Sequence, residues 1–155
     1  MGGTKYIYHS PLGLLSVTCE GSTVTGLVFT EETETQTTSW PNSFLHTKVC
    51  RWLDQYFSGE IPDFLPPLAP AGTPFQQRVW SELLKIPFGH TITYGELARQ
   101  VDCRSAQAIG QAVGHNPIAI LIPCHRVVGH NNPGGYAYGI ERKRHLLLIE
   151  KTTIQ

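Results

Sequence analysis

The residues best suited to chemistry lie together at Pro123-Cys124-His125-Arg126. A cysteine attacks as the thiolate, and a free thiol with a pKa of about 8.5 stays mostly protonated unless a cation or base lies beside it. Here a histidine and an arginine follow Cys124 directly, and a proline and an apolar run precede it. This pattern predicts a nucleophilic cysteine. An inert buried thiol is the alternative, because adjacent side chains need not point the same way.

The other cysteines carry no such signal. Cys19, Cys50 and Cys103 form no Cys-x-x-Cys pair. Together with His9 and His46 they also lack the spacing of zinc ligands, so we expect no metal site.

Composition limits the class of protein. A hydrophobic share of 41% with 15% charged residues is typical of a globular chain. No apolar run approaches the roughly 18 residues that span a bilayer, so we expect no membrane partner. Residues 1–8 lack the layout of a secretion signal, and we therefore expect a cytoplasmic protein with reduced thiols.

The net charge is zero, but the charges are unevenly distributed. Residues 1–70 carry three basic and seven acidic side chains, whereas residues 71–155 carry nine basic and five acidic ones. The positive excess in the second part favours a polyanionic partner. Chance segregation of a few charges is the alternative.

The first part of the sequence predicts an antiparallel sheet. Three short runs rich in Val, Leu, Tyr and Thr are separated by turn sequences; they cover residues 5–9, 14–19 and 24–29. Turns this short favour a meander. The polar residues 31–39 predict a loop.

A helix and a connector follow. Asn42 can cap a helix that runs to about Phe57 and ends at Gly59. Five of the eleven prolines lie within residues 61–74, a run that excludes a helix and predicts a stiff connector. We therefore expect two domains, residues 1–70 and 71–155.

The second part predicts mainly helices, over residues 73–85, 94–101, 105–114 and 141–150. Residues 102–104 form a three-residue turn between two of them, which is the layout of a helix-turn-helix module. The apolar residues 118–122 predict a buried strand or extended segment. The expected fold class is α+β, with a small N-terminal antiparallel-sheet domain and a mainly helical C-terminal domain.

The second helix of this module, residues 105–114, is rich in small residues. Helical spacing predicts an inner face of Ala106, Ile109 and Val113. The outer face is predicted to hold Ala108, Gln111 and Ala112, beside Gly110 and Gly114. Small side chains would let the helix approach a minor groove only about 6 Å wide. A core helix packed closely against its neighbours explains the same pattern.

Residues 122–129, Ile-Pro-Cys-His-Arg-Val-Val-Gly, resemble the active-site signature of the O6-alkylguanine-DNA alkyltransferases. Other blocks of the second half match the family in order: Tyr94, Gly114-His115-Asn116-Pro117, Gly135-Tyr136-Ala137, and the final helix from Glu141 to Glu150. The N-terminal meander fits the family's first domain more loosely. Several ordered blocks make the resemblance specific.

The resemblance implies single-use DNA repair, in which an alkyl group moves from O6 of guanine to Cys124. His125 would take the thiol proton through a bound water, and Glu150 would orient that histidine, the logic of a nucleophile–base–orienter triad. Tyr94 would donate its O–H to the base, and Asn116 would tie the recognition helix to the active-site loop. No external cofactor is expected.

The resemblance also implies how substrate and DNA are bound. The substrate-binding set is Val127, Tyr136, Ala137 and Tyr138, with the backbone carbonyls of Cys124 and Val127 accepting the exocyclic amine. The DNA-binding set is Ser105, Ala106, Gln107, Ala108 and Arg126. The expected partner is alkylated double-stranded DNA, entered through the minor groove by a monomer that rotates the damaged nucleotide out of the stack.

Two positions depart from the family. Gln107 stands where relatives carry an arginine that fills the gap left by the rotated base, which predicts weaker DNA binding. Tyr138 stands where a glycine is usual, which predicts altered acceptance of bulky adducts. Some relatives bind zinc in the first domain, but a second cysteine near the start is absent here.

Three other functions are compatible with parts of the pattern. A Cys-His hydrolase would turn over repeatedly on an ester or peptide. A non-catalytic binder of alkylated DNA would replace the cysteine, so Cys124 speaks against it. A transcription factor is disfavoured, because the recognition helix offers few side chains that read bases.

Overall fold

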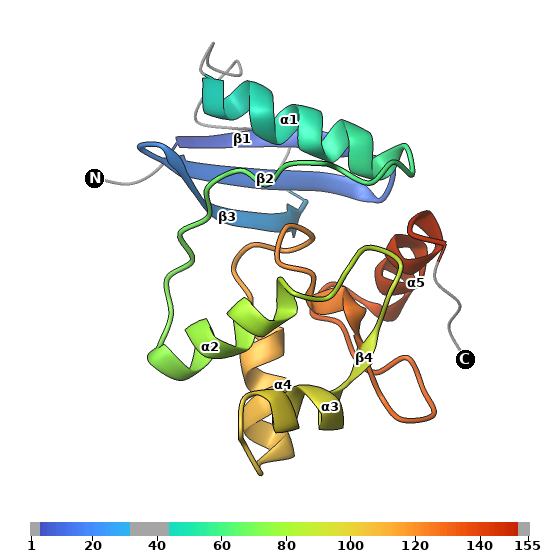
Figure 1. Cartoon of the computed structure of the whole chain (residues 1–155). Coiled ribbons are helices and arrows are strands. Elements are labelled where there is room, and N and C mark those ends of the chain that lie inside the picture. The colour runs from blue at the N-terminus through green and yellow to red at the C-terminus, as the bar shows by residue number, and fades with distance from the viewer. Residues whose placement is uncertain (1–3, 32–43, 152–155) are drawn as a thin grey trace. The chain divides into compact units, whose positions relative to one another are not determined.

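A computed structural model describes residues 4–31 and 44–151, which divide into two compact units (Figure 1). The first contains the described residues up to Pro70 together with Pro117–Ala119. The second contains Ala71–Asn116 and the described residues from Ile120 onward. An antiparallel sheet followed by a mainly helical region confirms the predicted α+β class.

The sheet of the first unit is the predicted meander. Its strands are β1 (Thr4–Ser10), β2 (Gly13–Glu20) and β3 (Thr23–Thr30), paired antiparallel in the order β1-β2-β3. Each reversal contains a glycine with positive φ, Gly13 at 127° and Gly21 at 60°, a conformation that glycine adopts without steric cost.

The helix α1 (Phe44–Phe57) covers one face of this sheet (Figure 1). Its buried side chains repeat at helical spacing: Val49, Trp52, Leu53 and Tyr56. Tyr8 at the end of β1 stacks on Phe57 with ring centroids 6.3 Å apart. The predicted cap Asn42 and nearly all of the predicted loop, residues 32–39, lie outside the described residues.

Residues 61–73 of the proline-rich run contain no helix, as predicted, and two residues near the end of the run bind the sheet. Val24 N–H donates to the Pro67 carbonyl, and Ala69 N–H donates to the Val24 carbonyl. At the other end of β3, Leu27 exchanges the same kind of bonds with residues 117 and 119. Both segments therefore satisfy backbone groups on the open edge of β3, which would otherwise be exposed to pairing with another chain.

Side-chain caps set the boundaries of three helices in the second unit. Helices α2 (Pro74–Leu83) and α3 (Tyr94–Gln100) begin with complete capping boxes, Thr73 with Gln76 and Thr93 with Glu96. Helix α4 (Ala106–Gly114) begins at Ser105, whose hydroxyl accepts from Ala108 N–H. The predicted helix-turn-helix module is thus present as α3 and α4.

Two further features complete this unit. Helix α5 (Ile140–Ile149) lies where the last helix was predicted, and Cys124–Arg126 form a single 3-10 turn. The strands β4 (Ile92–Thr93) and β5 (Val127–Val128) pair in parallel. This two-residue pairing was not predicted, because it joins segments 35 positions apart that are too short to show alternation.

The predicted faces of α4 are partly wrong. Ile109 and Val113 are buried as expected, but Ala112 is buried and Ala106 is exposed. The reason is the packing of α2: Trp80 is buried against α4 and its Nε1–H donates to the Ala112 carbonyl at 2.9 Å. The inner face is therefore the i, i+3, i+4 set that begins at Ile109.

Candidate functional site

Cys124 opens the 3-10 turn between a buried apolar segment and β5. Residues 118–122 are all buried, in agreement with the prediction of a buried extended segment, and isolated bridges replace a regular strand. Ile120 has a φ of 70°, a strained conformation for a β-branched residue that costs about 1–3 kcal/mol and persists only where the surroundings enforce it. The thiol is thus held on a constrained backbone, with the Cys124 residue 6% exposed.

Asn116 connects the end of α4 to this loop. Its side-chain Nδ2–H donates to the Ile122 carbonyl at 2.7 Å, and the residue is buried. Asn116 therefore ties the end of α4 to the segment that precedes Cys124.

Burial and the neighbouring polar groups have opposite effects on the pKa of Cys124. Burial raises the pKa of the thiol above its ordinary value, and this effect outweighs a hydrogen bond with Asn116 and the positive charge of Lys143, which both lower that pKa. A buried cysteine without such partners would be inert. Here the site contains specific groups that favour the thiolate.

Glu150 accepts four hydrogen bonds at the far side of the turn. His125 Nε2 lies 2.5 Å from Oε2, Arg126 Nε donates to Oε1 at 2.8 Å, Arg126 Nη2 donates to Oε2 at 3.2 Å, and Gly89 N–H donates to Oε1 at 3.0 Å. Burial alone would raise the pKa of the carboxyl, but the bonds and charges of His125 and Arg126 outweigh it and lower that pKa to about 2. The carboxylate is ionised at neutral pH.

This arrangement defines the state of His125. Because an ionised carboxylate accepts from Nε2–H, the ring nitrogen Nδ1 carries the lone pair of the neutral imidazole. Burial lowers the pKa of His125, and the charges of Arg126 and Lys143 lower it further against the opposing effect of Glu150. His125 is therefore neutral and able to accept a proton at pH 7.

The assignment of Arg126 to DNA binding is wrong. Arg126 is 7% exposed, and its guanidinium is bound to Glu150 and, through Nη1, to the Ile86 carbonyl at 2.7 Å. The Ile86–Gly89 segment, predicted only as a helix stop, supplies both that carbonyl and the Gly89 amide. Arg126 is a buried structural partner of the Glu150 carboxylate.

The charge of Cys124 acts on three tyrosines. Burial raises the pKa of Tyr94, Tyr136 and Tyr138, and the negative charge of a Cys124 thiolate raises each one further. Tyr136 and Tyr138 form an edge-to-face pair with centroids 5.5 Å apart. Tyr136 and Tyr138 therefore lie against each other, while Ala137 between them in the sequence is exposed.

The residues predicted to meet DNA lie on α4 and its cap. Gln107 and Ala106 are exposed and Ala108 is half-buried, while the Ser105 hydroxyl is used as the helix cap. The exposed positions continue along one face through Gly110, Gln111 and Gly114. At both glycines an added Cβ would meet no atom within 4 Å, so this face is open to a close partner.

Comparisons with known proteins agree with this site. The sequence profile described as "6-O-methylguanine DNA methyltransferase, DNA binding domain" matches residues 74–152, and the one described as "6-O-methylguanine DNA methyltransferase, ribonuclease-like domain" matches residues 4–70. The methylated-DNA–protein-cysteine methyltransferase of Mycobacterium tuberculosis is 46% identical over 147 residues, 92% of this chain and 89% of the relative. The chain belongs to the 6-O-methylguanine DNA methyltransferase family.

Other family members are similar over the same extent. The methylated-DNA–protein-cysteine methyltransferase of Haemophilus influenzae is 39% identical over 150 residues, 93% of this chain and 84% of the relative. A crystal structure of the Mycobacterium tuberculosis OGT in complex with DNA superposes with a TM-score of 0.84 at 44% identity, covering 96% of this chain and 92% of that one. The likeness therefore includes both units of the family fold.

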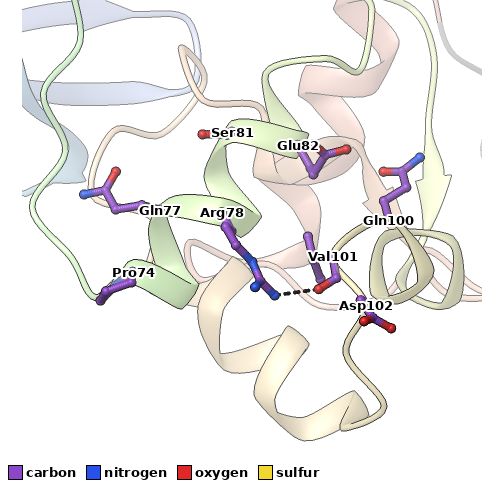
Figure 2. A pocket seen from close by; sticks show the side chains of 8 residues that line it. All are labelled: Pro74, Gln77, Arg78, Ser81, Glu82, Gln100, Val101 and Asp102. Atoms are coloured by element: carbon purple, nitrogen blue, oxygen red, sulfur yellow. Dashed lines mark hydrogen bonds between the residues drawn. The ribbon is translucent and has the colours of Figure 1, made fainter.

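A groove of about 480 Å³ lies on the second unit away from these residues (Figure 2). It is lined by α2 and the end of α3, where Arg78 Nη2 donates to the Val101 carbonyl at 2.6 Å. None of its lining residues belongs to the Cys124 site.

In residues 4–31 and 44–151 no group of three His, Cys, Asp or Glu side chains is placed to hold a metal ion. Over the same ranges no helix has the length and apolar character needed to cross a membrane.

Lys143 was missed as a site residue. The sequence analysis did not single it out, whereas its side chain is fully buried and bonded to Val127 and Gly135. Its spacing from Leu146, Leu147 and Glu150 is the signal that could have placed it on the inner face of α5.

Proposed function

We propose that this chain repairs DNA by transferring an alkyl group from O6 of guanine to Cys124, once per molecule. The observation that carries the proposal is the buried Cys124, with a neutral His125 beside it and an ionised Glu150 behind that histidine, in a member of this family. A thiol is activated as a nucleophile by a neighbouring base and by a third group that orients this base.

In the proposed step the Cys124 proton passes through a water molecule to Nδ1 of His125. The thiolate sulfur then attacks the alkyl carbon, so that the S–C bond forms while the C–O6 bond breaks and its electron pair stays on the guanine. Glu150 stabilises the imidazolium that results. The product is a thioether, which water does not cleave, and this accounts for a single turnover without an external cofactor.

The departing guanine carries negative charge that a donor must neutralise. Tyr94 is suited to this role, because burial and the charge of a Cys124 thiolate raise its pKa and keep the phenol protonated. Tyr136 would form a wall of the pocket and the backbone around Ala137 would border it. The carbonyls of Cys124 and Val127 would accept the exocyclic amine. Val127 O already accepts from Lys143, and a carbonyl oxygen has a second lone pair that can accept from the base.

DNA is the partner, and we propose that the exposed face of α4 enters its minor groove. The open space at Gly110 and Gly114 supports a close approach of the helix backbone. Gln107 is exposed near the start of α4, where it would fill the gap left by the rotated nucleotide, with Ala106, Ala108 and the Ser105 cap along the backbone. A monomeric state and a cytoplasmic location stay predictions from the sequence.

Mass spectrometry after incubation with methylated duplex DNA tests the proposal. One methyl group is expected on the peptide that contains Cys124, in a stoichiometry of one per chain. Cys124→Ser should abolish the modification, whereas Cys50→Ser, which changes a half-buried cysteine of the other unit, should retain it. An unmodified Cys124 after exposure to excess damaged duplex would refute the proposal, as would repeated turnover.

A further inference from the structure

Two glutamines lie one turn apart on the exposed face of α4. Gln107 and Gln111 are both exposed, and a spacing of four residues places them on the same side of the helix, about 6 Å apart along its axis. Gly110 and Gly114 complete the i, i+3, i+4, i+7 set, and both are exposed. The face that is proposed to enter the minor groove therefore alternates glutamine with glycine.

The two side-chain amides are available to a partner. Within residues 4–31 and 44–151 neither amide forms a hydrogen bond. Each has a carbonyl oxygen that accepts hydrogen bonds and an NH2 group that donates two. Beside them, an added Cβ at Gly110 or Gly114 would meet no atom within 4 Å. The amides of Gln107 and Gln111 thus project from a face whose backbone is open to a close partner.

The charge of α4 favours contact with base edges over contact with phosphates. The helix contains no acidic or basic residue from Ala106 to Gly114. Arg104 and His115, which are both exposed, lie just beyond its two ends. Phosphates attract cations, whereas amides form paired hydrogen bonds with the edges of bases. The middle of the face is therefore suited to bases.

The minor groove presents one chemical difference that an amide recognises. An A·T pair presents only acceptors there, whereas a G·C pair adds the N2 amino group of guanine as a donor. On a G·C pair a glutamine satisfies both of its groups, because Oε1 accepts from N2–H and Nε2–H donates to N3 of the same base. On an A·T pair Oε1 faces acceptors and finds no donor. A glutamine at this place therefore favours G·C.

We infer that Gln111 is a specificity-determining residue, which contacts the minor-groove edge of a base pair beside the damaged guanine and favours G·C at that pair. Gln107 is proposed above to fill the gap at the lesion. Since base pairs stack about 3.4 Å apart, an amide about 6 Å further along α4 falls on a neighbouring pair. The inference rests on the proposed function, because it adds a sequence context to the DNA that α4 is proposed to enter.

The test changes one amino group of the DNA at a time. Duplexes with a single O6-methylguanine carry A·T flanks, and one G·C pair is placed in turn at each nearby position on either side. The rate of methyl transfer to Cys124 is measured by peptide mass spectrometry at subsaturating DNA. One position should raise the rate about fivefold, the lower end of the discrimination given by a bidentate contact. Hypoxanthine in place of that guanine removes only the N2 amino group and should return the rate to the A·T level.

Three variants assign the effect to one side chain. Gln111→Met keeps the length and the helix propensity of the residue without the amide, and it should bring the ratio of the guanine and hypoxanthine rates to about one. Gln107→Met should lower the rate on all duplexes and keep the ratio. Gln100→Met changes an exposed glutamine of α3 in the groove of Figure 2 and should match the parent.

An unchanged ratio in Gln111→Met would overturn the inference, as would equal rates of the parent on the guanine and hypoxanthine duplexes. A purely structural effect of the substitution lowers both rates by the same factor and leaves their ratio in place. The ratio therefore reports the contact itself.

Equilibrium binding separates this inference from the proposed function, because binding needs no transfer. Affinities for the same duplexes are measured by fluorescence anisotropy for Cys124→Ser, with and without Gln111→Met. A preference for the N2 amino group that depends on Gln111, in a chain that transfers no methyl group, contradicts the proposed function alone. Methyl transfer to Cys124 without that preference contradicts the inference alone.

Discussion

Replacement of Glu150 by glutamine isolates the ionised carboxylate at the centre of the site. The side chain keeps its size, but one oxygen becomes an amide that donates hydrogen bonds. Three of the groups around it, His125 Nε2, Arg126 and Gly89 N–H, are themselves donors. Glu150→Gln therefore places donor against donor and leaves the buried guanidinium without its counter-charge.

The magnitude follows from the pKa of the carboxyl group. The folded protein lowers that pKa from 4.5 to about 2, and a tenfold change in proton affinity corresponds to about 1.4 kcal/mol. The ionised form is thus favoured by about 3 kcal/mol. Removal of one partner from a buried ion pair generally costs about 3–5 kcal/mol, which is the same range. We expect Glu150→Gln to lower the free energy of unfolding at pH 7 by about 3 kcal/mol.

The pH dependence gives a second readout. Because the folded pKa of Glu150 is depressed, its stabilisation is fully present above pH 4.5 and is lost as pH falls towards about 2. The difference in unfolding free energy between the parent and Glu150→Gln should therefore shrink over that range. Alkyl transfer at pH 7 should fall by about a hundredfold or more, because His125 loses its orienting partner.

Urea unfolding followed by circular dichroism from pH 2 to pH 8 measures the effect, and single-turnover transfer to Cys124 gives the rate. Glu141→Gln is the matched control, because this carboxylate lies on the same helix with its side chain 77% exposed. That variant should change stability by no more than about 0.5 kcal/mol. A loss below about 1 kcal/mol for Glu150→Gln at pH 7, or a difference that stays constant below pH 4.5, would refute the reasoning.

Two departures from the family give further predictions. Gln107→Arg adds a charge to the exposed start of α4 and should raise DNA affinity severalfold, with a salt dependence steeper by about one counterion; unchanged affinity and transfer rate would remove Gln107 from the proposed gap-filling role. Tyr138→Gly removes the ring that packs edge-to-face on Tyr136 and should alter transfer from benzylguanine while leaving methyl transfer intact. Equal benzyl transfer rates in Tyr138→Gly and the parent would contradict the steric role of this side chain.

Local signals made most of the fold predictable. The meander followed from short apolar runs and glycine turns, and the helix starts at Thr73, Thr93 and Ser105 followed from side chains that cap orphan amides. The parallel pairing of β4 with β5 was not predictable, because two residues on each side carry no periodic pattern. The faces of α4 were partly wrong because the packing of Trp80 decides them, and that contact spans 32 positions.

The site residues were predictable where residue types and their order in the sequence were enough to identify them. Cys124, His125 and Glu150 came from a resemblance in consecutive residues, and the structure places the last two in contact. Arg126 was assigned to DNA binding and Lys143 was not singled out, because charged side chains are buried only rarely and an exposed position is the ordinary expectation. Only the three-dimensional arrangement shows that each cation has buried acceptors.

At Gly110 the stability of α4 and its close approach to DNA place opposite demands on the side chain. Alanine in an exposed helix interior is more stable than glycine by about 0.5–1 kcal/mol, and an added methyl group here collides with nothing in the protein. Glycine at this position thus lowers the stability of the helix that is proposed to lie against the duplex. Gly110→Ala would therefore give a more stable protein that binds DNA less closely.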